Sequence, residues 1–336
     1  MKAVRLHDAL DLRVEEVEAP SPPPPGYVNL KVRAAGICGS DLHNFRTGQW
    51  ISRRPSTAGH EFCGEVIAAG DGVTDLKAGD YVSADSRVWC GACPACLSGR
   101  PHVCEKLGFV GEVCDGGFAE QTQLPARLLL RHDRSLAPRI AAMAEPLAVA
   151  LHAVRRLAVP AGEPILVIGC GTIGGLSALL LSKLHDGPLL LADLNADRLA
   201  LVEDVTGGRR VELDKASIGA LPGDRRLRYA LDATGSVQAI RAGLDLLSGG
   251  GAFALVGISH GRIDLDPNLL VEREIGLLGC HAFNDELPEA VSLLPALAPS
   301  LDRLCDPIPT LDDVPGTYGK LLEGGSSKLK SVVELD

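Results

Sequence analysis

The segment that most constrains the fold is a glycine-rich turn between an apolar segment and a helical one. After Ile-Leu-Val-Ile at 165–168, the chain reads Gly169-Cys170-Gly171-Thr172-Ile173-Gly174, which fits the pattern GxGxxG. In a strand–turn–helix unit the first glycine permits the tight turn, the second lets a pyrophosphate approach the backbone, and the third allows close packing of helix on strand. The pattern therefore predicts a dinucleotide site at the helix N-terminus, with a purely structural glycine turn as the alternative.

Further apolar segments follow this turn. Strands are expected at 189–192, 229–232, 252–256 and 275–279, and helices at 146–159 and from the turn to about 184. Apolar strands that alternate with helices indicate a parallel sheet covered on both faces. The predicted fold class is α/β, with a doubly wound Rossmann sheet as one domain.

An acidic residue at the end of the second of these strands bears on the choice of dinucleotide. Asp193 lies 19 residues after Gly174, where a carboxylate can bind both ribose hydroxyls and repels a 2′-phosphate. This favours NAD over NADP. Arg198 points the other way, because a guanidinium attracts that phosphate.

The first 130 or so residues have a different, β-rich pattern. Apolar and polar residues alternate at 28–34, after the proline run at 22–25, and further strands are expected at 62–69 and 81–84. A last strand is expected at 331–335. These segments predict a second domain built mainly from strands.

Four of the ten cysteines are closely spaced, namely Cys90, Cys93, Cys96 and Cys104. Four thiolates at this spacing suit one tetrahedral zinc ion, and the glycine, proline and alanine between them let the loop curl. An iron–sulfur cluster and four buried free thiols are the alternatives. Five other cysteines are interpreted as ordinary small residues without a metal role: Cys63, Cys114, Cys170, Cys280 and Cys305.

A second set of metal-ligating residue types is spread along the chain as Cys38, His60-Glu61 and Glu145. A catalytic zinc needs about three protein ligands and one open position, which a thiolate, an imidazole and carboxylates would supply. Each residue also has another explanation. Cys38 suits a small buried position, His60-Glu61 suits a surface pair, and Glu145 suits a helix N-terminus.

The charge balance excludes several classes of partner. Lys plus Arg number 33 and Asp plus Glu 43, which gives a formal net charge of −10. An acidic chain is a poor ligand for nucleic acid or for an anionic membrane surface. No apolar run approaches the roughly 18 residues of a membrane span, and the first residues lack the pattern of a signal peptide. We therefore expect a soluble cytoplasmic protein, without a disulfide framework.

Together these motifs resemble the zinc-dependent medium-chain dehydrogenase/reductase family over nearly the whole chain. The matching motifs are Gly36-Ile37-Cys38-Gly39-Ser40-Asp41-Leu42-His43, Gly59-His60-Glu61-Phe62, the four-cysteine segment, Gly116-Gly117-Phe118-Ala119-Glu120, Glu145-Pro146-Leu147, the glycine-rich turn and Asp232-Ala233-Thr234-Gly235. The Glu-Pro-Leu motif is similar to that of the sorbitol, butanediol and threonine dehydrogenase branch. The resemblance implies a GroES-like catalytic domain at 1–147 and 283–336 and a Rossmann domain at 148–282.

The resemblance also implies roles for individual residues. Cys38, His60 and Glu61 would be direct ligands of a catalytic zinc, with Glu145 approaching the metal directly or through water. Asp41 would orient the site, while Ser40 and His43 would pass the alcohol proton to solvent. Capping of the helix after Cys38 is a compatible role for Ser40 and Asp41. The dinucleotide contacts would include the turn residues, Thr172 and Ile173 among them, and Asp193, Arg198, Val256, Gly257 and Ile258.

The implied activity is oxidation of a polyol or another secondary alcohol to a ketone, with zinc and NAD. A threonine-type amino-alcohol dehydrogenase is the alternative within the class. A non-catalytic dinucleotide-binding protein and a zinc-free reductase are alternatives outside it, and the intact ligand residues count against both. The expected partner is a small alcohol, and the family suggests a homotetramer or homodimer.

Overall fold

The computed structural model describes residues 1–219 and 226–335. The chain divides into two compact units. Unit 1 comprises Met1–Glu145 and Leu287–Asp336, and unit 2 comprises Pro146–Glu286. Within the described ranges, no helix is both long and apolar enough to cross a bilayer.

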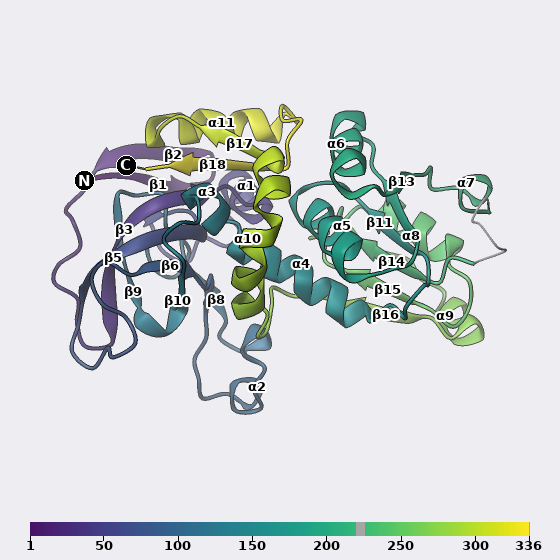
Figure 1. Cartoon of the computed structure of the whole chain (residues 1–336), viewed down its shortest axis with the longest axis horizontal. Helices are drawn as coiled ribbons and strands as arrows, with labels where there is room; N and C mark the ends of the chain where they lie inside the picture. Colours follow the sequence, from purple (N-terminus) through teal and green to yellow (C-terminus); the bar gives the residue numbers. More distant parts are fainter. Residues whose placement is uncertain (220–225, 336) are drawn as a thin grey trace. The chain divides into compact units, whose positions relative to one another are not determined.

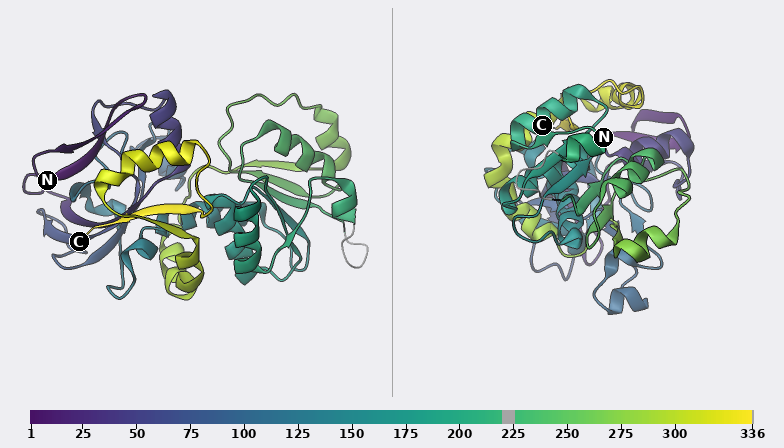
Figure 2. Two further views of the ribbon diagram at one scale, coloured as in Figure 1. Left: turned by 90° about the horizontal axis from the view of Figure 1, so that it is seen from above. Right: turned by 90° about the vertical axis from the view of Figure 1, so that its right-hand side faces the viewer.

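Unit 2 contains a six-stranded sheet in which every neighbouring pair of strands is parallel. The order is β13-β12-β11-β14-β15-β16, the strand order of a dinucleotide-binding doubly wound sheet. The view from above in Figure 2 places the strands between teal helices on one side and green helices on the other. The strands are β11 (Ile165–Ile168), β12 (Leu189–Ala192), β13 (Arg209–Arg210), β14 (Tyr229–Asp232), β15 (Ala252–Leu255) and β16 (Gly276–Gly279).

The helices of unit 2 follow the strands as the sequence pattern predicts. They are α5 (Thr172–Leu184), α6 (Ala196–Thr206), α7 (Lys215–Gly219), α8 (Val237–Leu246) and α9 (Pro267–Arg273). All four residues of β11 are buried, and so is most of α5, because a strand between two helical layers has no solvent-facing side. The α/β class and the Rossmann sheet are confirmed.

Unit 1 is mainly β-structure, as expected. Its larger sheet has the order β10-β6-β5-β3-β18-β17, with β9 also paired to β3. Figure 1 shows yellow β18 beside purple β3, so the end of the chain completes a sheet begun near its start. The strands of this sheet are β3 (Tyr27–Gly36), β5 (Glu61–Ala69), β6 (Tyr81–Ala84), β9 (Gln121–Pro125), β10 (Leu129–His132), β17 (Cys305–Ile308) and β18 (Lys330–Glu334).

Smaller elements complete unit 1. A three-stranded sheet has the order β2-β1-β4, and β7 pairs with β8. These strands are β1 (Lys2–Asp8), β2 (Asp11–Glu16), β4 (Ser56–Thr57), β7 (Arg87–Val88) and β8 (Gly108–Phe109). The helices are α1 (Gly39–Thr47), α2 (Pro94–Leu97), α3 (Pro138–Ala141), α10 (Leu287–Leu304) and α11 (Val314–Leu322), while α4 (Ala144–Leu157) begins at the end of unit 1 and continues into unit 2.

Tyr318 of α11 lies in the core of unit 1. Its ring makes edge contacts with Phe45 and Phe118, at centroid distances of 5.6 and 6.4 Å. Its hydroxyl is buried and has no hydrogen-bond partner among the described residues. Burial raises the pKa of Tyr318 well above its usual value, so the group stays a neutral phenol. A buried hydroxyl without a partner costs stability.

Replacing Tyr318 by phenylalanine should therefore raise the free energy of unfolding by about 1 kcal/mol, because it removes the unpaired hydroxyl and keeps the ring. The matched control is Tyr81→Phe, since the Tyr81 hydroxyl donates to Glu65 Oε2 at 3.2 Å. That control should lower the free energy of unfolding or leave it unchanged. Urea unfolding of the two variants measures the difference, and a loss of stability in Tyr318→Phe as large as in the control would contradict the prediction.

Candidate metal and cofactor sites

The four closely spaced cysteines come together in one loop of unit 1. Their sulfur atoms all lie within 4.8 Å of one another. The Sγ–Sγ distances are 3.5 Å from Cys93 to Cys96, 3.8 Å from Cys93 to Cys104, and 3.5 Å from Cys104 to Cys90. A tetrahedron with Zn–S bonds of about 2.3 Å has edges of about 3.8 Å, so the spacing fits one zinc ion.

Backbone N–H groups prepare this loop for thiolate ligands. Ala92 N donates to Cys90 Sγ at 3.5 Å, and Lys106 N donates to Cys104 Sγ at 3.3 Å. Such bonds favour the negative sulfur. The bond from Ala92 N lowers the pKa of Cys90, and bonds from Cys96 N and Glu105 N lower that of Cys93 to about 6, whereas burial raises that of Cys96 to about 12. The donor set and its spacing are those of a structural Cys₄ zinc site.

The second predicted ligand set also comes together, although its members are far apart in sequence. Cys38 lies at the N-cap of α1, Glu61 is the first residue of β5, and His60 immediately precedes it. One ligand atom from each of the three lies within 4.8 Å of the other two. His60 and Glu61 are buried and Cys38 is half-buried. A thiolate, an imidazole and a carboxylate are three ligands, so a tetrahedral zinc bound to them would keep its fourth position open, as a catalytic zinc requires.

Asp41 fixes two of these ligands. Its Oδ2 accepts a hydrogen bond from Cys38 N at 2.9 Å, and its Oδ1 lies 3.3 Å from His60 Nδ1. A carboxylate at Nδ1 leaves Nε2 of the imidazole for a metal. Burial lowers the pKa of His60, but the nearby Asp41 and Cys38 outweigh burial and raise it well above its usual value.

Glu61 pairs with a buried lysine that the sequence did not point to. Lys330 Nζ donates to Glu61 Oε2 at 2.5 Å and to Ile37 O at 3.0 Å, and the side chains of Lys330 and Glu61 are 2% and 1% exposed. Burial lowers the pKa of Lys330, and Glu61 outweighs it and raises the pKa above its usual value. The other oxygen, Oε1, is buried and has no hydrogen-bond partner in the part of the chain that the structure describes. That oxygen is available to a metal ion.

Glu145 lies near this group but is not a member of it. It is 5% exposed at the first turn of α4, and its Oε1 accepts a hydrogen bond from Ser86 Oγ at 2.6 Å. Burial raises the pKa of Glu145 to about 7; the nearby His60 opposes this rise and the nearby Glu61 adds to it. Ser86 is a contact that no sequence motif indicated.

The two predicted proton-relay residues lie on α1. Ser40 Oγ is 3.4 Å from His60 Nε2, the nitrogen that Asp41 leaves available. His43 Nε2 is 2.9 Å from Gln49 Oε1 and 3.3 Å from Thr47 Oγ1, and the His43 ring packs on Trp50 at a centroid distance of 4.3 Å. Ser40 therefore lies beside a candidate metal ligand, and His43 lies one helical turn further on.

The glycine-rich turn of unit 2 has the geometry that its three glycines predict. Gly169 has φ +93°, and a Cβ on Gly174 would lie 1.7 Å from Gly169 O. At Gly171, the N-cap of α5, a Cβ would meet no atom within 4 Å. This space lies at the N-terminus of α5, where backbone N–H groups and the helix dipole favour a phosphate. The turn fits a dinucleotide, and Thr172 and Ile173 form the first turn of α5.

Asp193 is hydrogen-bonded to the same turn. It follows β12, its Oδ2 accepts a hydrogen bond from Cys170 N, and its Oδ1 accepts one from Asn195 N at 2.6 Å. Asn195 in turn caps α6, where its side chain accepts from Asp197 N and Arg198 N. Burial raises the pKa of Cys170 to about 12, so this thiol in the turn stays protonated and unreactive.

The remaining predicted cofactor residues follow β15. Val256 and Gly257 are half-buried, and Ile258 is 51% exposed. A Cβ on Gly257 would lie 2.2 Å from Gly235 N, so glycine is required for the two loops to approach. Asp232 closes β14 and accepts from Thr234 Oγ1 at 2.6 Å and Gly235 N at 2.9 Å. The Asp232–Gly235 motif therefore shapes the loop that faces Gly257.

Two models of protein families match the chain. Residues 24–134 match the alcohol dehydrogenase GroES-like domain, and residues 175–296 match the zinc-binding dehydrogenase domain. The first match lies within unit 1, and the second covers most of unit 2 and the first part of α10.

Known proteins resemble the chain over most of their lengths. L-galactonate-5-dehydrogenase of Escherichia coli K12 is 34% identical over 74% of each chain, and L-threonine 3-dehydrogenase of Bacillus velezensis is 33% identical over 79% of each. The crystal structure of 2R,3R-butanediol dehydrogenase from Bacillus subtilis superposes with a TM-score of 0.91 at 30% identity, and it covers 100% of this chain and 99% of its own.

The resemblance inferred from the motifs is thus confirmed by sequence and by fold. The Cys₄ group, the Cys/His/Glu group and the dinucleotide turn are all present in one chain. The chain belongs to the zinc-containing medium-chain alcohol dehydrogenase superfamily and is an NAD(P)-dependent dehydrogenase that acts on CH–OH donors.

Proposed function

We propose that the chain oxidises a polyol or another secondary alcohol to a ketone, with NAD as the hydride acceptor. The observation that carries this proposal is the convergence of Cys38, His60 and Glu61, with one Glu61 oxygen buried and unpaired. In this proposal unit 1 is the zinc-binding catalytic domain and unit 2 is the dinucleotide-binding domain. The overall reaction moves a hydride from the carbinol carbon to the nicotinamide ring and releases the hydroxyl proton to solvent.

Cofactor and protein divide the chemistry between them. Zinc supplies Lewis acidity that lowers the pKa of an alcohol, and NAD supplies the hydride acceptor. Cys38, His60 and Glu61 would hold the metal, and Asp41 keeps the His60 ring in position through Nδ1. Glu145 would approach the metal directly or through water. Ser40 would accept the alcohol proton, and His43 would pass it to solvent.

Two finer choices rest on particular residues. NAD rather than NADP is favoured by the Asp193 carboxylate beside the glycine-rich turn. The Glu145-Pro146-Leu147 motif is shared by the polyol and threonine dehydrogenases of one branch, so a polyol is the first candidate and a threonine-type amino alcohol, supported by the similarity to a threonine dehydrogenase, is the second. A homodimer or homotetramer remains part of the proposal, and light scattering after gel filtration measures it.

A spectrophotometric panel tests the proposed activity. Zinc-loaded protein is offered sugar alcohols, diols, aldonates and threonine, each with NAD and with NADP, and formation of the reduced nucleotide is followed. We expect turnover with NAD and at least one polyol or diol. Turnover of threonine alone would select the second candidate, and no reduction with any pair would overturn the proposal.

Replacing Asp193 by asparagine tests the cofactor choice. Asparagine keeps an oxygen for Cys170 N but removes the negative charge that repels a 2′-phosphate. The ratio of kcat/KM for NADP to that for NAD should therefore rise by about tenfold or more. Asp197→Asn, at an exposed position on α6, is the control and should leave the ratio unchanged. An unchanged ratio in Asp193→Asn would show that Asp193 does not select the dinucleotide.

A further inference from the structure

His43, the second residue of the proposed proton relay, has defined contacts along one edge of its imidazole ring. The residue is buried in α1. Its Nε2 lies 2.9 Å from Gln49 Oε1 and 3.3 Å from Thr47 Oγ1. A neutral imidazole carries its proton on one ring nitrogen and accepts a proton on the other. The partners of Nε2 therefore decide which nitrogen of His43 can act as a base.

Thr47 shows which atom donates at this edge of the ring. Its Oγ1 lies 2.9 Å from His43 O, and a carbonyl oxygen can only accept, so the hydroxyl proton lies between these two oxygens. Gln49 N also donates to Thr47 Oγ1, at 3.2 Å. A hydroxyl has one proton, and the carbonyl already receives it. Toward Nε2 the hydroxyl is therefore an acceptor, and Nε2 carries the proton.

The side chain of Gln49 leads to the same tautomer. Its carboxamide oxygen faces Nε2 and accepts the N–H. If the carboxamide were turned over, its NH₂ group would donate to an unprotonated Nε2. The lone pairs of the Thr47 hydroxyl would then face the lone pair of that nitrogen, which is unfavourable. The Nε2–H form satisfies both neighbours, so Nδ1 keeps the lone pair and is the nitrogen that can take up a proton.

The ring and the loop that carries Gln49 are both held on α1. Gly48 ends the helix with φ +65°, and its N–H donates to Asn44 O at 2.8 Å. Trp50 N donates to Asn44 Oδ1 at 2.9 Å, and the Trp50 ring packs on the His43 ring at a centroid distance of 4.3 Å. Gln49 lies between these two anchored residues, so its backbone has a fixed position beside the imidazole.

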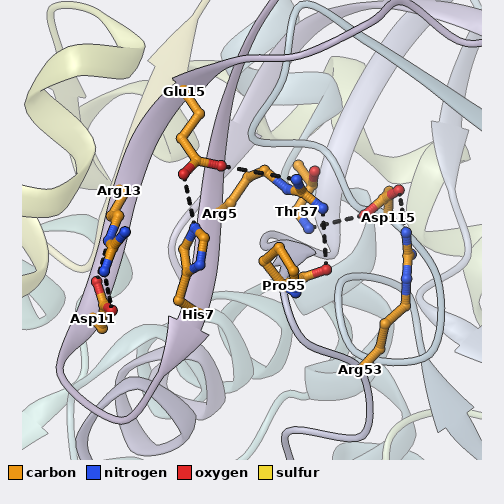
Figure 3. Close-up of polar contacts among 9 residues, drawn as sticks. All are labelled: Arg5, His7, Asp11, Arg13, Glu15, Arg53, Pro55, Thr57 and Asp115. Atoms are coloured by element: carbon orange, nitrogen blue, oxygen red, sulfur yellow. Dashed lines mark hydrogen bonds and ion pairs between the residues drawn. The ribbon is translucent and has the colours of Figure 1, made fainter.

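The same segment is also fixed where it continues toward β4 (Figure 3). Arg5 donates to Pro55 O at 3.1 Å, and Arg53 donates to Asp115 Oδ2 at 2.8 Å. Thr57 N donates to the other carboxylate oxygen of Asp115 at 2.9 Å. The segment that follows α1 is therefore anchored at both ends, which is what precise orientation of a relay group needs.

We propose that Gln49 is a positioning residue of the proton relay and that Nδ1 of His43 is the base it prepares. Gln49 and Thr47 hold the ring as the Nε2–H tautomer. Nδ1 then accepts the proton that the alcohol releases through Ser40, and the imidazolium so formed loses that proton to water, which restores the Nε2–H form. This inference rests on the proposed function and adds to it the atom that takes the proton and the residues that select that atom.

The tautomer of His43 can be measured without turnover. In protein labelled with ¹⁵N-histidine at alkaline pH, protonated and unprotonated ring nitrogens give well-separated NMR signals, and their couplings to the ring protons distinguish Nδ1 from Nε2. His43→Asn identifies the His43 signals by their loss. We expect Nε2–H in the wild type, a mixture of tautomers in Gln49→Ala, and Nε2–H again in Gln49→Glu, which restores an acceptor.

The rate of NADH formation in a single turnover at saturating alcohol measures the effect on the relay. Gln49→Ala should lower this rate by about fivefold, because a hydrogen bond of ordinary strength no longer favours the competent tautomer. Gln49→Ala/Thr47→Val should lower it further, and the Kd for NADH should stay unchanged in both variants. Gln123→Ala is the matched control and should keep the wild-type rate, since Gln123 of β9 donates to Ser21 O at 3.0 Å and to Asn29 Oδ1 at 2.8 Å.

The two measurements separate this inference from the proposed function. An Nδ1–H form in the wild type, or an unchanged tautomer in Gln49→Ala whatever its rate, would overturn the inference and leave the proposed alcohol oxidation intact. A changed tautomer without a change in rate would show that Nδ1 of His43 is not the base of the relay. If the wild type has a Gln49-dependent Nε2–H form but oxidises no alcohol of the panel, the proposed function fails and the tautomer assignment stands.

Discussion

Replacing Cys38 by serine is expected to lower kcat/KM for alcohol oxidation by about 10³-fold or more. The change removes the thiolate from the Cys38–His60–Glu61 group and so removes the metal that polarises the alcohol, an effect of several kcal/mol on the barrier. The Cys₄ group lies in a different loop and has its own complete set of sulfurs. The variant should therefore keep one zinc per chain where the wild type holds two, and it should bind NADH unchanged because the glycine-rich turn is intact.

Metal analysis and steady-state kinetics on the same sample test this prediction. Cys114→Ser is the matched control, since Cys114 is also half-buried but belongs to neither metal group. It should keep both zinc ions and nearly all activity. Full activity of a Cys38→Ser sample with confirmed loss of one zinc would refute the metal-dependent mechanism.

The sequence predicted the local part of the architecture well. The five strands that were expected in unit 2 are mainly apolar segments, and each begins and ends within one residue of the prediction. These signals are local, because a strand buried on both faces must be apolar throughout. The edge strand β13 consists of Arg209–Arg210 alone, is exposed, and has no such pattern.

Helix α10 was not predicted, and the reason is clear in its sequence. It runs over Leu287–Leu304 with Pro295 and Pro299 inside it. Proline lacks the N–H that a helix interior needs, so it normally indicates a helix end. Here the buried leucines recur with helical spacing, including Leu294, Leu297, Leu301 and Leu304. Tertiary packing of that face outweighs the local cost of the prolines.

The residues of the candidate sites likewise include some that the sequence predicts and some that it does not. The four cysteines and the glycine-rich turn could be recognised because their geometry is encoded by short spacing. Cys38, His60, Glu61 and Glu145 could be grouped only through the resemblance to a family. Ser86 and Lys330 could not be found at all, since each reaches the site through sheet pairing or loop packing. Lys330 lies in β18 near the end of the sequence, and β18 pairs with β3, which lies near its start.

Replacing Lys330 by methionine should lower the free energy of unfolding of zinc-free protein by about 3–5 kcal/mol. The pair with Glu61 is almost fully buried, and removing one partner leaves an uncompensated carboxylate inside unit 1. The double variant Glu61→Gln/Lys330→Met should recover most of that loss, because no buried charge remains. With zinc bound the cost of Lys330→Met should be smaller, since the metal would then compensate the charge of Glu61.

Urea unfolding followed by tryptophan fluorescence measures these differences, and both tryptophans, Trp50 and Trp89, lie in unit 1. Lys320→Met, at an exposed position on α11, is the control and should change stability by less than about 0.5 kcal/mol. If Lys330→Met costs no more than this control, the ion pair does not hold Glu61 in place. If the double variant is as unstable as Lys330→Met, the loss comes from packing of the lysine stem rather than from the unpaired charge. Recovery in the double variant, together with a smaller loss in zinc-loaded protein, would identify Glu61 as the shared partner of lysine and metal.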